Sequence, residues 1–220
     1  MNDFTTPNQG SAHHGRAYRI GIDGLERLFD LVQQQYDEVF GPKVKDGAIT
    51  LERLNRFAEL PVGYHDEQRP GSYAIRQTND GTLFHYAVGP HAVKRLLHPA
   101  NRRLWRAEKT DAGWEVSADD GRPRPVALFG IRSCDVESID ILDEVFTGGD
   151  YVEPRYQLAR QQLLLITASC PAPSAVCFCT SMGHGPRPRH YDINLTEIHT
   201  ASEHFFVADA GTQRGQELLA

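Results

Sequence analysis

The sequence predicts an α/β protein, with an α+β N-terminal half followed by a βαβ-containing half that carries a mostly parallel small sheet. Two observations predict this class. In the second half, an apolar run (VALFGI, 126–131), a helical stretch (CDVESIDILDEVF, 134–146) and another apolar run (QLLLITAS, 162–169) follow in the order strand, helix, strand. In the first half, one amphipathic helix stands beside segments broken by turn residues, which is typical of mixed helices and hairpins.

The 220 residues suffice for one large or two small domains. We expect a disordered tail at 1–17, an α+β region at 18–120 and an α/β cysteine-bearing region at 121–220. The tail lacks the basic and apolar segments of a signal peptide, and no apolar run is long enough to span a bilayer. The net charge of −6 argues against a nucleic-acid or anionic-membrane partner. A cytoplasmic location is therefore expected.

The first half contains four predicted elements. A helix is expected within 23–42, ended by Gly41-Pro42, because six apolar residues follow helical spacing. These are Leu25, Leu28, Phe29, Val32, Tyr36 and Val39. Two strands are expected within 72–89 around an Asn-Asp-Gly turn, a short helix within 91–99 ended by Pro99, and a second hairpin within 104–117.

The second half contains the βαβ unit and two later elements. The apolar side of its helix is expected to consist of Val136, Ile139, Leu142 and Val145. A third strand is expected at 204–209, and a helix begins in GTQRGQELLA at the end of the chain. Such crossovers are almost always right-handed with parallel strands, so the carboxyl ends of the strands meet at one edge of the sheet.

All four cysteines of the chain are predicted to lie at that edge. Cys134 follows the first strand by three residues, Cys170 directly follows the second, and Cys177 and Cys179 lie on the loop that leaves it. Ligands of open α/β sheets bind at this edge. Asp135 is expected to cap the helix, whose N-terminal dipole would favour a thiolate at Cys134.

The residue pattern leaves the bound species open. Zinc needs sulfurs roughly 3.8 Å apart, whereas Cα atoms two positions apart in an extended loop, as in Cys177-Phe178-Cys179, are separated by about 6.7 Å. That separation suits a wider [4Fe–4S] cluster, although a tight turn would also serve zinc. A lone cysteine is most often a buried hydrophobe, which four converging cysteines disfavour. A thiol–disulfide catalyst is disfavoured because no C-x-x-C opens a helix.

Other polar residues give weaker hypotheses. Arg69, His91 and Lys94 could seat an anion, but a turn and a solvated helix face explain them better. Arg132 and Arg155 either donate to a cluster or form surface ion pairs, and His184 is a loop donor or a surface residue. No catalytic residue is proposed, because no nucleotide motif, catalytic triad or paired carboxylates appear.

Several sequence motifs resemble a known family. They are LFGIRSCDVESIDILDEVF, PRYQLARQQLLLITASC and CFCTSMGHGPRPRHYDINLTEI, supported in the first half by GPKVKDGAITLERL, ELPVGYHDEQRPGSYAI and FHYAVGPHAVKRLLHP. The chain resembles, over roughly 20–220, the iron–sulfur beta subunit of cytoplasmic sulfhydrogenases and hydrogenases, which is similar to the iron–sulfur (A-type) component of anaerobic sulfite reductase. The resemblance implies a non-catalytic electron-transfer component that links a flavin-containing reductase subunit to a catalytic metallo-subunit. It also implies that Cys134, Cys170, Cys177 and Cys179 bind a [4Fe–4S] cluster.

One departure from the family concerns its C-terminal part. Family members continue with a ferredoxin-like segment that carries two further C-x2-C-x2-C-x3-C runs, whereas this sequence has no cysteine after Cys179. The sequence is then either a truncation or a protein that works with one cluster. The main rival hypothesis is a structural four-cysteine zinc module that shapes a docking surface, and a weaker one is a nucleotide- or flavin-binding domain.

Overall fold

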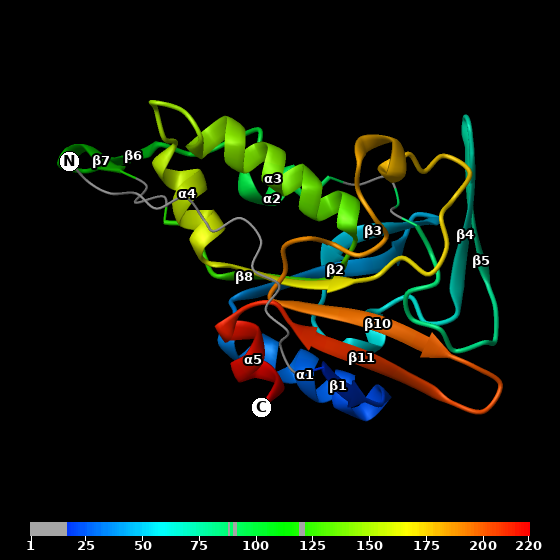
Figure 1. Ribbon diagram of the computed structural model, residues 1–220. Helices are drawn as coiled ribbons and strands as arrows, with labels where there is room; N and C mark the ends of the chain where they lie inside the picture. Colours follow the sequence, from blue (N-terminus) through cyan, green and yellow to red (C-terminus); the bar gives the residue numbers. More distant parts are fainter. Residues whose placement is uncertain (1–16, 88, 90–91, 119–121) are drawn as a thin grey trace.

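A computed structural model describes residues 17–87, 89, 92–118 and 122–220. Its fold is α/β, as the sequence predicts, and consists of a seven-stranded sheet with helices on both faces (Figure 1). The strand order is β1-β11-β10-β9-β8-β2-β3. The strands are β1 (Ala17–Ile20), β2 (Glu38–Lys45), β3 (Ala48–Arg53), β8 (Val126–Ile131), β9 (Leu163–Ala168), β10 (Ile193–His199) and β11 (His204–Ala210).

The four central strands run parallel. β10, β9, β8 and β2 pair in this sense, while β11, β1 and β3 add antiparallel edges. The parallel pairing of β8 with β9 confirms the predicted βαβ unit. Because β9 is buried along its whole length, its side chains pack into the cores on both faces of the sheet. This explains its nearly unbroken apolar run.

Helices cover the two faces unequally. On one face, α1 (Ile22–Gln35) and α5 (Gln213–Leu219) pack over the larger core, and on the other lie α2 (Lys94–Leu97), α3 (Ser133–Thr147) and α4 (Pro154–Gln161) (Figure 1). Full burial of a large apolar side chain contributes about 1.5–3 kcal/mol. The two cores therefore hold the central strands, and with them their carboxyl ends, in a fixed arrangement.

Two hairpins and two short 3-10 helices lie outside the sheet. The hairpins are β4 (Tyr64–Arg69) with β5 (Ser72–Gln77), and β6 (Trp105–Thr110) with β7 (Gly113–Ala118). The 3-10 helices are η1 (Phe57–Glu59) and η2 (Cys179–Met182). The hairpin predicted within 104–117 is confirmed as β6–β7, and the short helix before Pro99 is confirmed as α2.

The predicted helix over 23–42 is wrong in its last third. α1 ends at Gln35, Tyr36 is extended (φ −120, ψ 138), and Val39 lies in β2. Val39 is buried there between the partners of β2 rather than on a helix, so the apolar spacing continued past the helix only by coincidence. Gly41-Pro42 falls inside β2 and ends nothing.

The predicted hairpin over 72–89 is confirmed in its first strand, β5, and wrong in its turn and second strand. β5 pairs with β4, which precedes it, through a turn in which Gly71 has φ 74. Residues 82–87 form no strand. The backbone N–H groups of Leu83 and Phe84 donate instead to the carboxylate of Glu197, at 2.8 Å each. A distant side chain thus replaces the strand partner that the local pattern suggested.

The second half follows the prediction more closely. β8, α3, β9, β11 and α5 are confirmed, whereas α4 and β10 were not predicted. Val145 is 66% exposed and does not belong to the apolar side of α3. The division at residue 120 stays a prediction, and residues 1–16 and His91 lie outside the described residues. Among the described residues, no helix is long and apolar enough to cross a membrane.

Candidate cysteine site at the carboxyl edge of the sheet

Two of the four cysteines lie on the framework of the βαβ unit. Cys134 is in the first turn of α3, which begins just after β8, and Cys170 follows β9 after one residue. A bulge at Gly130 shifts the register of β8 before its end. Gly130 has φ +75, and a Cβ there would lie 2.7 Å from the ring of Phe84, so only glycine fits. The bulge thereby sets where α3 starts.

The start of α3 is capped as the sequence predicts. The backbone N–H of Arg132 donates to Oδ2 of Asp135 at 3.0 Å, and Asp135 is buried. A carboxylate in this position satisfies a donor at the helix start and opposes the positive dipole end. Cys134 therefore lies on a helix turn of defined geometry.

The side chain of Arg132 is buried beneath this edge. It is 1% exposed, so the surface ion pair that the sequence allowed is wrong. Nη1 donates to the carbonyl oxygens of Ala168 (3.2 Å) and Ser169 (3.0 Å), and Nη2 to those of Phe84 (2.6 Å) and Tyr86 (2.9 Å). Its Nε has no hydrogen-bond partner among the described residues. One guanidinium thus joins the end of β9, the start of α3 and the segment 84–86.

The other two cysteines lie on a loop that closes on itself. The backbone N–H of Cys170 donates to the carbonyl of Pro186 at 3.0 Å, so residues 170–186 leave and return at one point. This is the geometry of an Ω-loop. Within it, Cys179 begins η2, which Gly183 ends with φ +76. Cys177 is exposed, and its Sγ accepts from the backbone N–H of Ser174 at 3.2 Å.

The loop also contacts α3 at two points. Nδ1 of His184 lies 3.1 Å from Oε1 of Glu137, in an ion-pair contact that is not aligned as a hydrogen bond. Nδ1 of His190, just after the loop, lies 3.0 Å from Oδ2 of Asp140. The loop therefore lies over the N-terminal half of α3 (gold in Figure 1). His184 faces a carboxylate and is not a plain surface residue.

The thiols influence one another electrostatically. Burial raises the pKa of Cys134 to about 12, and the charges of Asp135, Cys170 and Cys179 add to the effect. Burial also raises the pKa of Cys170, where the charge of Arg132 opposes the shift and Cys179 and Cys177 reinforce it. The Cys134 side chain is nevertheless exposed at the surface, so the thiolate expected there stays a prediction.

The four thiols share one edge without forming a closed set of ligands. Among the residues that the structure describes, no three His, Cys, Asp or Glu side chains lie close enough together to hold a metal ion. The chemistry of the set still fits a thiolate-bound cofactor, because four cysteine thiolates are the usual ligands of an iron–sulfur cluster and also of structural zinc. The buried guanidinium of Arg132 lies near enough to Cys170 to lower the pKa of that thiol against the effect of burial.

Two other sequence hypotheses place residues elsewhere. Arg155 lies on α4, which leads into the start of β9, whereas Cys170 follows its end. Arg69 ends β4 and Lys94 begins α2, and within the described ranges no hydrogen bond or ion pair joins them. Neither set belongs to the cysteine site.

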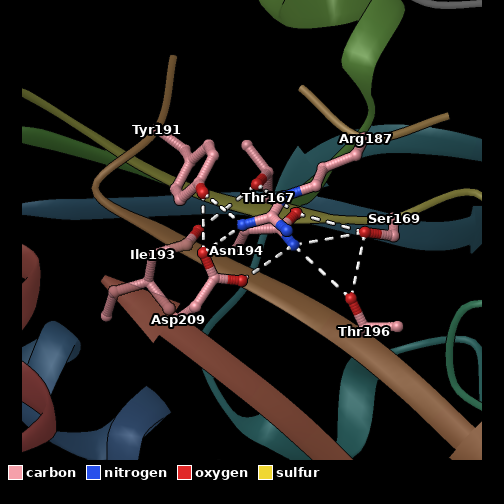
Figure 2. A network of polar contacts seen from close by, with 8 residues as sticks. All are labelled: Thr167, Ser169, Arg187, Tyr191, Ile193, Asn194, Thr196 and Asp209. Atoms are coloured by element: carbon pink, nitrogen blue, oxygen red, sulfur yellow. Dashed lines mark hydrogen bonds and ion pairs between the residues drawn. The ribbon is translucent and has the colours of Figure 1, made fainter. Parts of the chain in front are cut away.

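A polar network that the sequence analysis missed lies beside the cysteine loop (Figure 2). It joins the ends of β9 and β10 to β11 and to the returning end of the loop. Its members are Thr167, Ser169, Arg187, Tyr191, Ile193, Asn194, Thr196 and Asp209. The alternation in INLTEI, where Asn194 and Thr196 share one side of β10, was the available signal.

Comparison with curated proteins gives one informative match. The chain is 32% identical over 170 residues to "Sulfhydrogenase 2 subunit beta" of Pyrococcus furiosus, an alignment that covers 76% of this chain and 48% of the relative. The chain is a homologue of a sulfhydrogenase beta subunit. This sulfhydrogenase-subunit homologue spans about half the length of the curated relative that it matches. No family model matches the chain, and no solved structure matches it significantly.

The match confirms one part of the resemblance. The likeness to a hydrogenase beta subunit is supported at the level of sequence. The likeness to anaerobic sulfite reductase and the cluster-binding role of the cysteines stay predictions, because the name of the relative mentions neither.

Proposed function

We propose that the chain is the iron–sulfur electron-transfer part of an oxidoreductase complex and binds one [4Fe–4S] cluster through Cys134, Cys170, Cys177 and Cys179. The observation that carries this proposal is the position of the four thiols at one edge of the sheet, where Cys170 and Cys179 raise the pKa of Cys134, and Cys179 and Cys177 raise the pKa of Cys170. The homology to a sulfhydrogenase subunit supports the coarser part of the proposal, a place in an oxidoreductase complex.

Each residue has a distinct part in this proposal. The four cysteines hold the cofactor as thiolates, and they must lose their protons when it binds. When bound, a [4Fe–4S] cluster supplies one-electron chemistry. Arg132 offers a fixed positive charge beneath the site, with carbonyl contacts that keep it in place. A buried cation favours the more negative oxidation state, so Arg132 raises the reduction potential.

The surface around the cysteines suits contact with a partner protein. Phe178, between Cys177 and Cys179, is 67% exposed, and Met182 is 58% exposed. Aromatic residues and methionine are enriched at protein interfaces. The proposed partners, in one complex in the cytoplasm, are a flavin-containing reductase subunit together with a catalytic metallo-subunit. This chain carries no substrate chemistry of its own.

A structural zinc module that serves as a docking component is the alternative. It would use the same four cysteines. Zinc requires a compact tetrahedron of sulfurs. Phe178, between Cys177 and Cys179, has φ −134 and ψ 17 and is not extended, so the backbone at this step is compatible with zinc as well as with a cluster.

Metal analysis of the chain purified without oxygen tests the proposal. Iron and acid-labile sulfide at about four each per chain, with a brown absorption spectrum, would support the cluster. One zinc per colourless chain would overturn it in favour of the structural module, and a yellow flavin spectrum would favour a nucleotide-binding domain. Cys177→Ser and Cys179→Ser should each abolish the brown colour, whereas Ser181→Ala, on the same loop, should retain it.

A further inference from the structure

Both ends of the cysteine loop lie on one polar network. At the start of the loop, the backbone N–H of Ser169 donates to the carbonyl of Leu195 at 2.8 Å, and its Oγ accepts from Nδ2 of Asn194 at 3.2 Å. At the other end, Arg187 directly follows Pro186, whose carbonyl accepts from Cys170. The two ends are therefore held at neighbouring points of the sheet.

Asp209 joins the two ends. Its Oδ1 accepts from Nη2 of Arg187 at 2.5 Å and from the hydroxyl of Tyr191 at 2.6 Å, both on the returning chain. Its Oδ2 accepts from Nδ2 of Asn194 at 3.3 Å, and the same amide donates to Ser169, next to Cys170. Figure 2 shows the carboxylate of Asp209 between these donors. Asp209 lies on β11 and belongs to neither end of the loop.

The burial of these groups makes the contact effective. The side chain of Asp209 is 15% exposed and Asn194 is fully buried, whereas Arg187 is 58% exposed. Burial and the bond to Asp209 raise the pKa of Tyr191, so its hydroxyl remains a donor. A carboxylate that is largely shielded from water binds a guanidinium and a phenol more strongly than an exposed one.

The loop needs such a contact because little else orders its far end. Val176, Cys177 and Phe178 are exposed, and the protein bonds of Cys177 run to Ser174 within the loop. Holding both ends together lowers the conformational entropy that must be lost when the cysteines are brought to a common ligand.

We propose that Asp209 is a positioning residue of the cysteine site: through Arg187 and Tyr191 it holds the returning end of the loop against Ser169 and thereby places Cys177 and Cys179 near Cys134 and Cys170. This inference rests on the proposed function for the identity of the cofactor. The placement of the loop itself does not depend on it.

Asp209→Asn tests the proposal, because it removes the charge and keeps the shape. The control is Glu203→Gln, just before β11, where the ion pair of Glu203 with Arg19 is exposed at both ends. In the metal-free protein, Asp209→Asn should raise hydrogen exchange in peptides covering 170–190 by about tenfold, and Glu203→Gln should leave it unchanged. In reconstituted protein, a chelator should remove iron from Asp209→Asn about tenfold faster than from wild type.

A double-mutant cycle separates positioning from general destabilisation. Arg187 is largely exposed, so Arg187→Met should fold normally and reproduce the faster iron loss. Adding Asp209→Asn to Arg187→Met should change the rate little further if Asp209 acts mainly through Arg187. Full additivity, or unchanged loop exchange and iron loss in Arg187→Met, would overturn the proposal. If the wild-type protein binds no iron, the proposed cluster is wrong. The hydrogen-exchange experiment on the metal-free protein still tests whether Asp209 positions the loop.

Discussion

The two pairs of cysteines differ in how the fold holds them. Cys134 and Cys170 lie just after the ends of central strands. Cys134 is in the capped first turn of α3, and Cys170 is held by main-chain hydrogen bonds of its own N–H and of the N–H of Ser169. Cys177 and Cys179 lie on a loop in which their hydrogen bonds run to other residues of the same loop. The comparison teaches that the sheet prepares half of the site, while the other half depends on the loop and on what binds to it.

The same difference bears on how a metal would bind. The pKa of Cys170 is raised by burial, and that of Cys134, whose side chain is exposed at the surface, is raised as well. A bound metal would remove these protons and attract the loop pair. Binding and loop ordering are therefore expected to occur together.

The largest expected effect is a loss of stability on removing Arg132, which supports the strand ends next to Cys134 and Cys170. Arg132→Met should destabilise the metal-free protein by about 3–5 kcal/mol, because buried carbonyl acceptors at Phe84, Tyr86, Ala168 and Ser169 lose their donor. Urea unfolding measures the change. Arg53→Met is the control, since the Arg53 side chain is 54% exposed in its pair with Glu38, and it should change stability by less than about 1 kcal/mol. Equal effects of the two substitutions would contradict a structural role for the buried guanidinium.

Substitutions at two glycines of similar backbone geometry compare the strand-end part of the site with the loop part. Gly130→Ala should cost about 2–3 kcal/mol, since φ is +75 and the added Cβ meets Phe84 at 2.7 Å. Gly183→Ala has φ +76 with open space around it, so only backbone strain of about 1 kcal/mol is expected.

Chemical denaturation of both glycine variants, with and without metal, checks these values. Gly183→Ala should affect metal binding more than it affects the stability of the metal-free fold. A global loss at Gly183 as large as at Gly130 would show that the loop belongs to the rigid core after all.

The smallest effect concerns pH. The pKa of Cys134 rises from 9.0 to about 12 on folding, so the folded state retains a proton that the unfolded state loses. This group's contribution to stability is fully present below pH 9 and is lost as pH rises toward 12. Cys134→Ser should reduce the decline in stability of the metal-free protein above about pH 9. Ser181→Ala, which removes no titratable group from the cysteine loop, should leave that decline unchanged, and an undiminished decline in Cys134→Ser would contradict the raised pKa.

The sequence was informative where its signals were local. β8, α3 and β9 were predicted correctly because each is an uninterrupted apolar or helical stretch, and these elements place Cys134 and Cys170. The end of α1 was missed because Val39 continues a helical spacing while its strand partner, Ala127 of β8, is remote in sequence.

The supporting residues were missed for the same reason. Arg132 contacts carbonyls 36 to 48 positions away, so nothing near it in the sequence indicates burial. Asp209 contacts Arg187, 22 positions earlier, across a loop of unpredictable path. Side chains that hold a site through long-range contacts leave little local trace, whereas the ligands themselves form a recognisable pattern.

X-ray absorption at the iron edge of the anaerobically reconstituted chain tests the central claim most directly. The account predicts iron bound by sulfur alone, with a neighbouring iron visible in the spectrum, and loss of this signal in each of the variants Cys134→Ser, Cys170→Ser, Cys177→Ser and Cys179→Ser. Iron bound by nitrogen or oxygen without a neighbouring iron, or a chain that takes up only zinc, would contradict it.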